Sequence, residues 1–266
     1  MQMSDDSIKK TLLVTILLSL ICSVMVSGTS VFLREKQELN KVIDVQRNIL
    51  AISGLTDNVK ELTVSEVENL FKHVKPRLVD LKTGKFKKDI SGEEIQAYDQ
   101  RAAAKDPKES HDVSKSEDIA SIRRQANIAK VYIIEKNGTL ETLILPIHGY
   151  GLWSTLYGFM ALRGDMNTVA GMAFYEHSET PGLGGEVDNP SWKKKWIGKE
   201  VYDSNGSAVL GLIKGAVDNK NASAKYQIDG LAGATLTSVG VTNLVRFWMG
   251  DNGFGPFLKH LKKGGG

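Results

Sequence analysis

The sequence predicts an α+β protein in which one amino-terminal membrane helix precedes a strand-rich carboxy-terminal half. Residues 11–33 form an uncharged run of 23 residues, "TLLVTILLSLICSVMVSGTSVFL". The second half contains β-prone segments separated by helical patterns, which is typical of the α+β class. An apolar fraction of 41% and a charged fraction of 24% are those of a folded protein with a sizeable core.

The apolar run is long enough to be a membrane anchor. At about 1.5 Å per residue it reaches about 34 Å, and a hydrocarbon core is about 30 Å thick. A cleaved signal peptide has a shorter apolar stretch, and "VSG" at 26–28 is a weak cleavage candidate. A lipoprotein needs a small residue before its cysteine, but Ile21 precedes Cys22. A retained helix is therefore favoured over both alternatives.

The charged residues and the single cysteine limit the membrane orientation and the binding partners that can be expected. Lys9 and Lys10 on one flank of the run are nearly matched by Arg34 and Lys36 on the other, so only the short tail, residues 1–10, favours a cytoplasmic start. A net charge of +3, from 34 basic and 31 acidic residues, gives no reason to expect nucleic-acid binding. The single cysteine excludes a disulfide within one chain and a cysteine-based metal site.

Residues 34–129 are predicted to form a helical stalk and a polar connecting region. Helical spacing of apolar residues continues to a stop at Gly54. A second helix is expected after Thr63 or Ser65 as N-cap and is expected to end at Pro76. Residues 85–129 are rich in Lys, Asp, Glu and Ser, which predicts a solvent-facing connection with one short helix after Ser114.

Residues 130–266 are predicted to form the folded domain. "KVYIIEKNGTLETLILPI" indicates a hairpin, because both positions of an Asn137-Gly138 turn need positive φ. Strands are expected within 167–177 and 207–217, and a short helix with Asn189 as its cap. A last helix, capped by Thr237 or Ser238, buries an apolar face and ends at Gly250. That face consists of Val241, Leu244, Val245 and Trp248.

Three glycine-dense segments, residues 148–158, 179–190 and 229–238, interrupt the domain. None has the pattern of a phosphate loop or of a dinucleotide-binding turn. The small side chains of "DGLAGATLTS" leave backbone N–H groups uncovered before a helix, where a phosphate is favoured. The same pattern is also typical of a simple capped helix, so the residues alone leave both interpretations open.

The middle segment predicts a tight turn. Pro181 and Gly182 suit the two central positions of a type II turn, after which Leu183 is free to lie against a flat ligand. Glu176, His177 and Glu179 are a weak metal-binding pattern, and no metal site is predicted from them. Trp153 is, from the residues alone, an ordinary core or surface aromatic.

Five stretches together resemble the NqrC family, a component of the sodium-translocating NADH:quinone reductase of bacterial inner membranes, over nearly the whole chain. The resemblance implies FMN joined through a phosphoester to the last threonine of the attachment motif, which here is Thr235. Asp229, Gly233 and Ala234 match that motif, whereas Ala232 stands where the family usually has serine or threonine. The five stretches are "IKKTLLV", "HGYGLWSTLYGF", "YEHSETPGLGGEVDNPSWKKKWIGK", "DGLAGATLTSVGV" and "GDNGFGPFL".

The resemblance also implies the surroundings of the flavin. Trp153, Thr180 and Leu183 are expected near the ring system, with Glu179 and Lys214 as polar neighbours. Gly233, Ala234, Leu236 and Thr237 complete the expected cofactor-binding set around Thr235. No catalytic side chain and no metal is expected, since the redox chemistry belongs to the cofactor.

The implied function is an electron relay within a complex that oxidises NADH, reduces ubiquinone and exports sodium. The protein is expected to be inactive alone and to cross the inner membrane once, with residues 130–266 in the periplasm. Its implied partners are the other subunits, a flavin transferase and the lipid bilayer. The alternatives are the flavin subunit of an Rnf-type ferredoxin:NAD reductase and a membrane-anchored scaffold that carries out no redox chemistry. The terminal "GGG" fits either a native end or an expression remnant.

Overall fold

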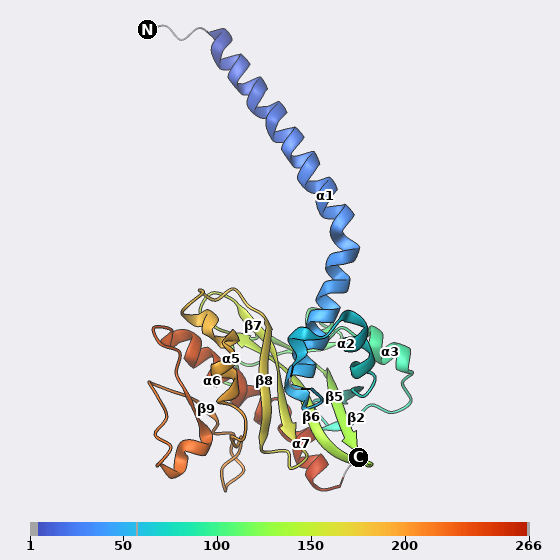
Figure 1. The fold of residues 1–266 in the computed structure, drawn as a ribbon, viewed down its shortest axis with the longest axis vertical. Helices are drawn as coiled ribbons and strands as arrows, with labels where there is room; N and C mark the ends of the chain where they lie inside the picture. Colours follow the sequence, from blue (N-terminus) through green and yellow to red (C-terminus); the bar gives the residue numbers. More distant parts are fainter. Residues whose placement is uncertain (1–4, 57, 265–266) are drawn as a thin grey trace. The chain divides into compact units, whose positions relative to one another are not determined.

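The computed structural model describes residues 5–56 and 58–264, which fall into two compact units (Figure 1). The first unit runs to Asp44 and the second begins at Val45. The helix α1 (Asp5–Ser53) passes through this boundary without a break in its helical structure. Each unit therefore contains part of α1.

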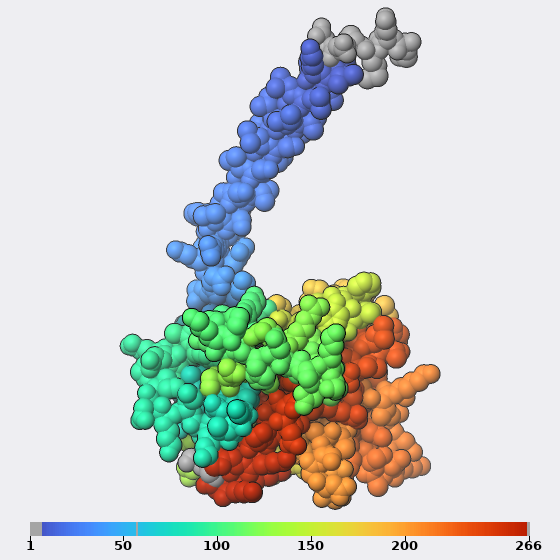
Figure 2. All heavy atoms as spheres, turned by 180° about the vertical axis from the view of Figure 1, so that it is seen from behind, coloured from blue at the N-terminus to red at the C-terminus, as the bar shows by residue number. Residues whose placement is uncertain are grey.

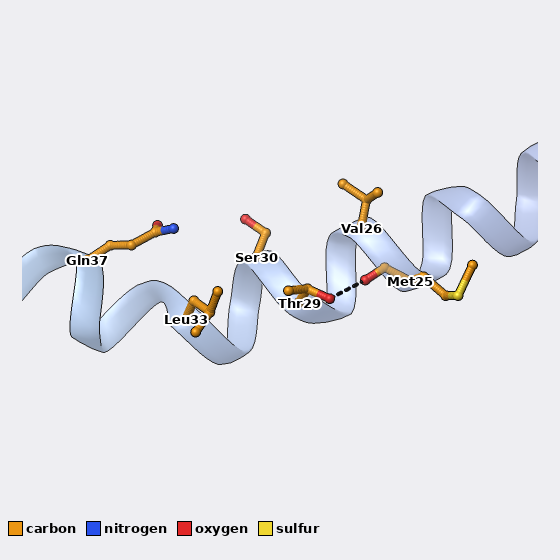
Figure 3. Close-up of a pocket in the computed structure, with 6 residues that line it drawn as sticks. All are labelled: Met25, Val26, Thr29, Ser30, Leu33 and Gln37. Carbon is orange, nitrogen blue, oxygen red and sulfur yellow. Dashed lines mark hydrogen bonds between the residues drawn. The ribbon is translucent and has the colours of Figure 1, made fainter.

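The first unit is helical throughout its described residues, and residues 11–32 are all exposed. Its most apolar window has a mean hydropathy of 2.3 and no buried residue, so α1 is long and apolar enough to cross a membrane. The hydroxyls of Thr11, Thr15 and Thr29 donate to carbonyls one turn earlier, at 2.8 Å, which satisfies them within the helix as a lipid environment requires. Figure 3 shows the Thr29 bond to the Met25 carbonyl along a shallow hollow.

The second unit is built on a six-stranded sheet in the order β2-β1-β5-β6-β7-β8, antiparallel throughout. These strands are β1 (Lys75–Asp80), β2 (Lys85–Phe86), β5 (Ile128–Lys136), β6 (Thr139–Tyr150), β7 (Thr155–Arg163) and β8 (Val169–Glu176). Two small sheets pair β3 (Ser110–Asp112) with β4 (Arg124–Ala126) and β9 (Gly211–Ile213) with β10 (Gln227–Asp229). The last pair is parallel.

Helices surround this sheet. The α-helices are α2 (Val64–Phe71), α3 (Gly92–Ala97), α4 (Gln100–Ala103), α5 (Pro190–Lys194), α6 (Thr235–Met249) and α7 (Gly255–Lys262). The short 3₁₀ helices are η1 (Val59–Glu61), η2 (Gly184–Asp188) and η3 (Ala222–Tyr226). The predicted α+β class is confirmed.

One face of the sheet packs against the carboxy-terminal helices. Leu143, Leu145 and Ile147 alternate along β6 and join one hydrophobic cluster with α6, which lies against β6. The Trp248 indole on α6 donates to the His148 carbonyl at 2.6 Å. Phe257 on α7 packs edge-to-face on Phe86 with the ring centroids 5.1 Å apart. Figure 2 shows the carboxy-terminal segment, in red, beside the teal segment of the chain.

The opposite face is covered by the end of α1. Ile49 and Leu50 are fully buried, and Ile52 lies so close to β8 that a Cβ on Gly171 would meet its Cβ at 2.8 Å. The Thr142 hydroxyl on β6 donates to the Ser53 carbonyl at 3.3 Å. The sheet is therefore buried on both faces, and the last turns of α1 belong to its core.

The predicted hairpin, the Thr63 and Asn189 caps and the helix stop at Gly54 are confirmed. Asn137 and Gly138 have φ of 54° and 76° between β5 and β6. Thr63 forms a capping box with Glu66, and Gly54 has a φ of 79° directly after α1. Asn189 caps α5.

Two predictions within residues 34–129 are wrong. The α2 helix ends at Phe71, and Pro76 lies in β1, beside the edge strand β2, instead of ending a helix. Residues 115–120 form turns instead of the expected helix, because the Asp118 carboxylate accepts from the Ile122 and Arg123 N–H groups, both at 2.8 Å, and so takes donors that a continued helix would use. This region also supplies β1 and β2 to the six-stranded sheet.

His148 gives the second unit an acid-sensitive contact. Its ring stacks on Tyr157 and lies 4.9 Å from Trp248, and burial, with Arg101 nearby, lowers its pKa to about 4 from 6.5. The neutral ring therefore stabilises the fold fully above pH 6.5, and this stability is lost as the pH falls from 6.5 towards 4.

The unfolding free energy of the wild type should decrease as the pH falls from 6.5 to 4. We expect this decrease to be about 3 kcal/mol smaller in His148→Phe, which keeps a stacked ring but has no group to protonate. Urea unfolding at several pH values measures the pH dependence of the unfolding free energy. The control is His73→Phe, which replaces an exposed histidine. Parallel pH profiles for wild type and His148→Phe would contradict this.

Candidate functional site

The three glycine-dense segments meet at the carboxylate of Glu179. Its Oε1 accepts from the backbone N–H groups of Leu152 and Trp153, both at 3.0 Å, and from that of Ser154 at 3.3 Å. Its Oε2 accepts from the Thr237 hydroxyl at 2.6 Å. These four donors and the carboxylate make up the Glu179 network. The network joins the loop after β6, the segment before η2 and the first turn of α6.

Glycines make room for this network. A Cβ on Gly184 would lie 2.6 Å from the Thr237 Oγ1 and 2.7 Å from the Glu179 Oε2. A Cβ on Gly151 would lie 2.6 Å from the Glu179 Oε1, and one on Gly240 would lie 2.4 Å from the Tyr150 carbonyl oxygen. No side chain fits at such distances without moving its neighbours, so the glycine density of these segments follows from their close approach.

Thr235 is the first residue of α6 and is exposed to solvent. Gly233, with a φ of 71°, turns the chain, and the N-cap residue Ala234 offers no side-chain bond. The predicted cap by Thr237 or Ser238 is therefore wrong. Thr237 donates to Glu179 instead, and the Ser238 hydroxyl accepts from the Leu231 N–H at 3.0 Å.

The start of α6 is suited to an anion. Among the described residues, no acceptor pairs with the N–H groups of Thr235, Leu236 or Thr237, and the Thr235 hydroxyl makes no hydrogen bond. These donors lie at the positive end of a 15-residue helix, where negative charge is stabilised. A phosphate esterified to Thr235 fits this chemistry.

Exposed apolar side chains lie in the segments that the Glu179 network joins. Trp153 is 65% exposed, Leu183 is 43% exposed and Leu236 is 59% exposed. A Cβ on Gly233 would lie 2.9 Å from the Leu183 Cδ2, so Leu183 lies directly against the turn before Thr235. Trp153 follows Leu152 in the loop that the Glu179 carboxylate holds. Exposed apolar groups of this size beside an anion site suit a ligand with both a flat ring and a phosphate.

The parallel pair of β9 and β10 brings Lys214 towards the same turn. Ile213 pairs with Asp229, so Lys214 and Gly230 follow at corresponding positions, and Gly230 donates to the Gly215 carbonyl at 2.9 Å. The Asp229 carboxylate accepts from the Val217 N–H at 2.8 Å and pairs with Lys195. Lys214 itself is exposed.

Glu179 stays ionised despite its burial. Desolvation raises its pKa, but the hydrogen bonds from Thr237, Trp153, Leu152 and Ser154 together outweigh it, so the net pKa is lowered. Thr180, the next residue, is exposed and accepts from the Leu183 and Gly185 N–H groups through its carbonyl at 3.1 and 2.9 Å. Gly182 has the positive φ, 76°, that the predicted type II turn requires.

The weak metal-binding pattern is engaged in other contacts. The His177 Nε2 lies 2.7 Å from the Asp188 carboxylate, and Glu176 forms a bidentate pair with Arg101 at 2.6 and 2.9 Å. Within residues 5–56 and 58–264, no group of three His, Cys, Asp or Glu side chains is arranged to hold a metal ion.

The sequence missed the network itself. Leu152, Ser154 and Gly184 gave no individual signal, because backbone donors carry no sequence pattern. The available signal was a lone acid between glycine-dense segments, which is common in turns and therefore unspecific.

Comparison with known proteins gives the class and then the family. Residues 151–250 match the FMN-binding domain family, and this range contains the whole Glu179 network and Thr235. The fold and the site therefore define an FMN-binding domain that follows an apolar helix long enough to cross a membrane.

Three relatives bear the name of the C subunit of Na(+)-translocating NADH-quinone reductase. The one from Pseudomonas aeruginosa is 50% identical over 98% of both chains, and that from Vibrio anguillarum is 45% identical over 100% of this chain and 99% of its own. The one from Yersinia pestis is 44% identical over 98% of this chain and 96% of its own. The chain belongs to this family, NqrC, which confirms the resemblance.

Solved structures agree with this assignment. The crystal structure of Shewanella oneidensis NqrC has a TM-score of 0.72 and 36% identity, and the similarity covers 82% of this chain and 96% of that one. The crystal structure of the same reductase component from Parabacteroides distasonis has a TM-score of 0.59 and 25% identity, with 86% and 96% covered.

We expect Gly184→Ala to lower the unfolding free energy by about 2 kcal/mol, because its methyl group would push Thr237 away from the Glu179 carboxylate. Urea unfolding of the detergent-solubilised chain measures this change. The control is Gly92→Ala, whose Cβ would meet nothing within 4 Å and which should change stability by less than about 0.5 kcal/mol. Equal effects of the two substitutions would show that the space at Gly184 is not required.

Proposed function

We propose that this chain is the FMN-bearing electron-relay subunit of a sodium-translocating NADH:quinone reductase, with FMN joined through a phosphoester to Thr235. Family membership and the FMN-binding domain match support the assignment and the cofactor. The observation that carries the attachment site is the exposed Thr235 hydroxyl, which makes no hydrogen bond within the described residues and lies beside unpaired N–H donors.

Thr235 Oγ1 acts as the nucleophile in this attachment. It would form the bond to the phosphorus of an activated flavin donor supplied by a transferase, with loss of its own proton and departure of the donor's leaving group. The first N–H groups of α6 stabilise the phosphate charge once the ester has formed. Bound FMN supplies reversible electron transfer, which protein side chains do not provide.

The residues around Thr235 are assigned to the ring system and its tail. Trp153 and Leu183 offer exposed apolar surface to the ring, and Thr180 lies in the same turn as Leu183. Lys214 supplies a positive charge from the β9 side, and Glu179 a fixed negative charge. Gly233, Ala234, Leu236 and Thr237 frame the ester through the turn and the first helical turn.

The proposed placement is a single-pass inner-membrane protein with its flavin domain in the periplasm. The apolar α1 supports the anchor, and the short amino-terminal tail supports a cytoplasmic start. Electrons pass through the flavin between other subunits of the complex, which oxidises NADH, reduces ubiquinone and exports sodium. The chain alone is proposed to be inactive.

Two rival functions have less support. The relatives from Pseudomonas, Vibrio and Yersinia bear the name of the sodium-translocating enzyme, which favours it over an Rnf-type ferredoxin:NAD reductase. A scaffold without redox chemistry gives no reason for an FMN-binding match that spans Thr235.

We expect Thr235→Val to abolish covalent flavin, since the variant lacks the hydroxyl but keeps the shape of the side chain. The protein is produced with the flavin transferase, and flavin fluorescence of the denatured band and the mass of the 235-containing peptide are measured. Electron transfer through the assembled complex should fall by at least about 100-fold, because a required carrier is lost.

The matched control is Thr139→Val, which removes an exposed hydroxyl at the start of β6, from a residue with no assigned role toward the flavin. It should keep full covalent labelling. Flavin that survives denaturation in Thr235→Val, or a wild-type peptide of unmodified mass from a competent host, would refute the proposed attachment.

A further inference from the structure

Glu179 is 5% exposed and lies at the centre of contacts between three segments that are remote in sequence. Each oxygen of its carboxylate serves a different segment. Oε1 collects the N–H groups of residues 152–154, and Oε2 takes the Thr237 hydroxyl. Among the described residues, no other side chain joins the Trp153 loop to the first turn of α6 by hydrogen bonds. This carboxylate is therefore the link between the two.

We propose that Glu179 is a positioning residue that holds the Trp153 loop and the first turn of α6 in one geometry, and so fixes the flavin surroundings around Thr235. This inference rests on the proposed function. It assigns Glu179 to the support of the site, through its contacts with protein donors.

The chemistry of the contacts requires an ionised carboxylate. All four partners donate, and an ionised carboxylate only accepts. A glutamine of the same shape would direct its NH2 group at one set of donors and leave those donors unpaired. No basic side chain pairs with Glu179 in the part of the chain that the structure describes, so backbone N–H groups and one hydroxyl alone balance its charge.

The Glu179 network is connected to Thr235 through the first turn of α6. Thr237 lies two residues after Thr235 in the same helical turn, and its hydroxyl is fixed by Glu179. From the other side, Ser238 holds the turn through the Leu231 N–H at 3.0 Å, and Ala234 donates to the Leu231 carbonyl at 3.1 Å. Loss of the Glu179 contact therefore removes the hydrogen-bonded link between the first turn of α6 and the Trp153 loop.

The test compares Glu179→Gln and Thr237→Val with two controls. Thr237→Ser keeps the hydroxyl, and Glu186→Gln neutralises a half-buried acid in the same segment that bonds Asn189 at 2.6 Å instead. Thr237→Val keeps the carboxylate and the side-chain volume, so it tests the link even where Glu179→Gln folds poorly.

Two readouts are taken on the full chain in detergent. Amide hydrogen exchange of residues 152–154, measured without flavin, should accelerate about tenfold or more in Glu179→Gln, as the loss of a charge-assisted bond predicts. In flavin-loaded protein, visible circular dichroism should fall at least about twofold, with a shifted midpoint potential, in both Glu179→Gln and Thr237→Val. Thr237→Ser and Glu186→Gln should match wild type in both readouts.

The outcomes separate this inference from the proposed function. If wild type carries covalent flavin while exchange, dichroism and potential are unchanged in Glu179→Gln and Thr237→Val, the positioning role is overturned and the attachment stays intact. Wild type without covalent flavin would overturn both. A Thr237→Ser variant as altered as Thr237→Val would also overturn the role, because the hydroxyl contact would then be irrelevant.

Discussion

A buried, ionised carboxylate is the constraint on which the rest of the site depends. Burying one charge costs several kcal/mol unless hydrogen bonds compensate it. Glu179 is compensated by four donors from two segments, so its charge and the folding of those segments depend on each other. The same constraint explains the glycines at 151, 184 and 240. The segments approach so closely at these positions that a Cβ atom would clash with neighbouring atoms.

The sheet supplies the rigid base for this arrangement. It is antiparallel, yet both of its faces are buried, one by α6 and α7 and the other by the end of α1. The loop after β6 and the start of α6 are therefore mounted on elements that pack against each other, with Trp248 bonded to the His148 carbonyl. A site built on packed strands and helices keeps its geometry better than one on free loops.

Local signals predicted much of the fold. Asn137-Gly138, Thr63 with Glu66, and Asn189 with Pro190 each act within a few residues, and each feature formed as expected. Predictions failed where a distant partner competes. Thr237 has the right chemistry for a cap, but Glu179, 58 residues away in sequence, takes its hydroxyl. Pro76 has the right chemistry to end a helix, but pairing with β5 places it in a strand.

The residues of the site also divide into those marked by a local sequence motif and those that depend on distant partners. Thr235 could be singled out because a family motif marks it, and its exposure and the unpaired donors beside it support the proposed attachment. The role of Glu179 could not be found from sequence, since three of its four partners are backbone groups with no residue signature.

The uncapped start of α6 has a consequence for maturation. A helix without a side-chain cap forgoes about 1 kcal/mol that a Ser, Thr, Asp or Asn would contribute. On the proposed attachment, the phosphate replaces that cap, so loading the cofactor also completes the folding of its own carrier. Apoprotein would then open more readily at this helix than the mature protein.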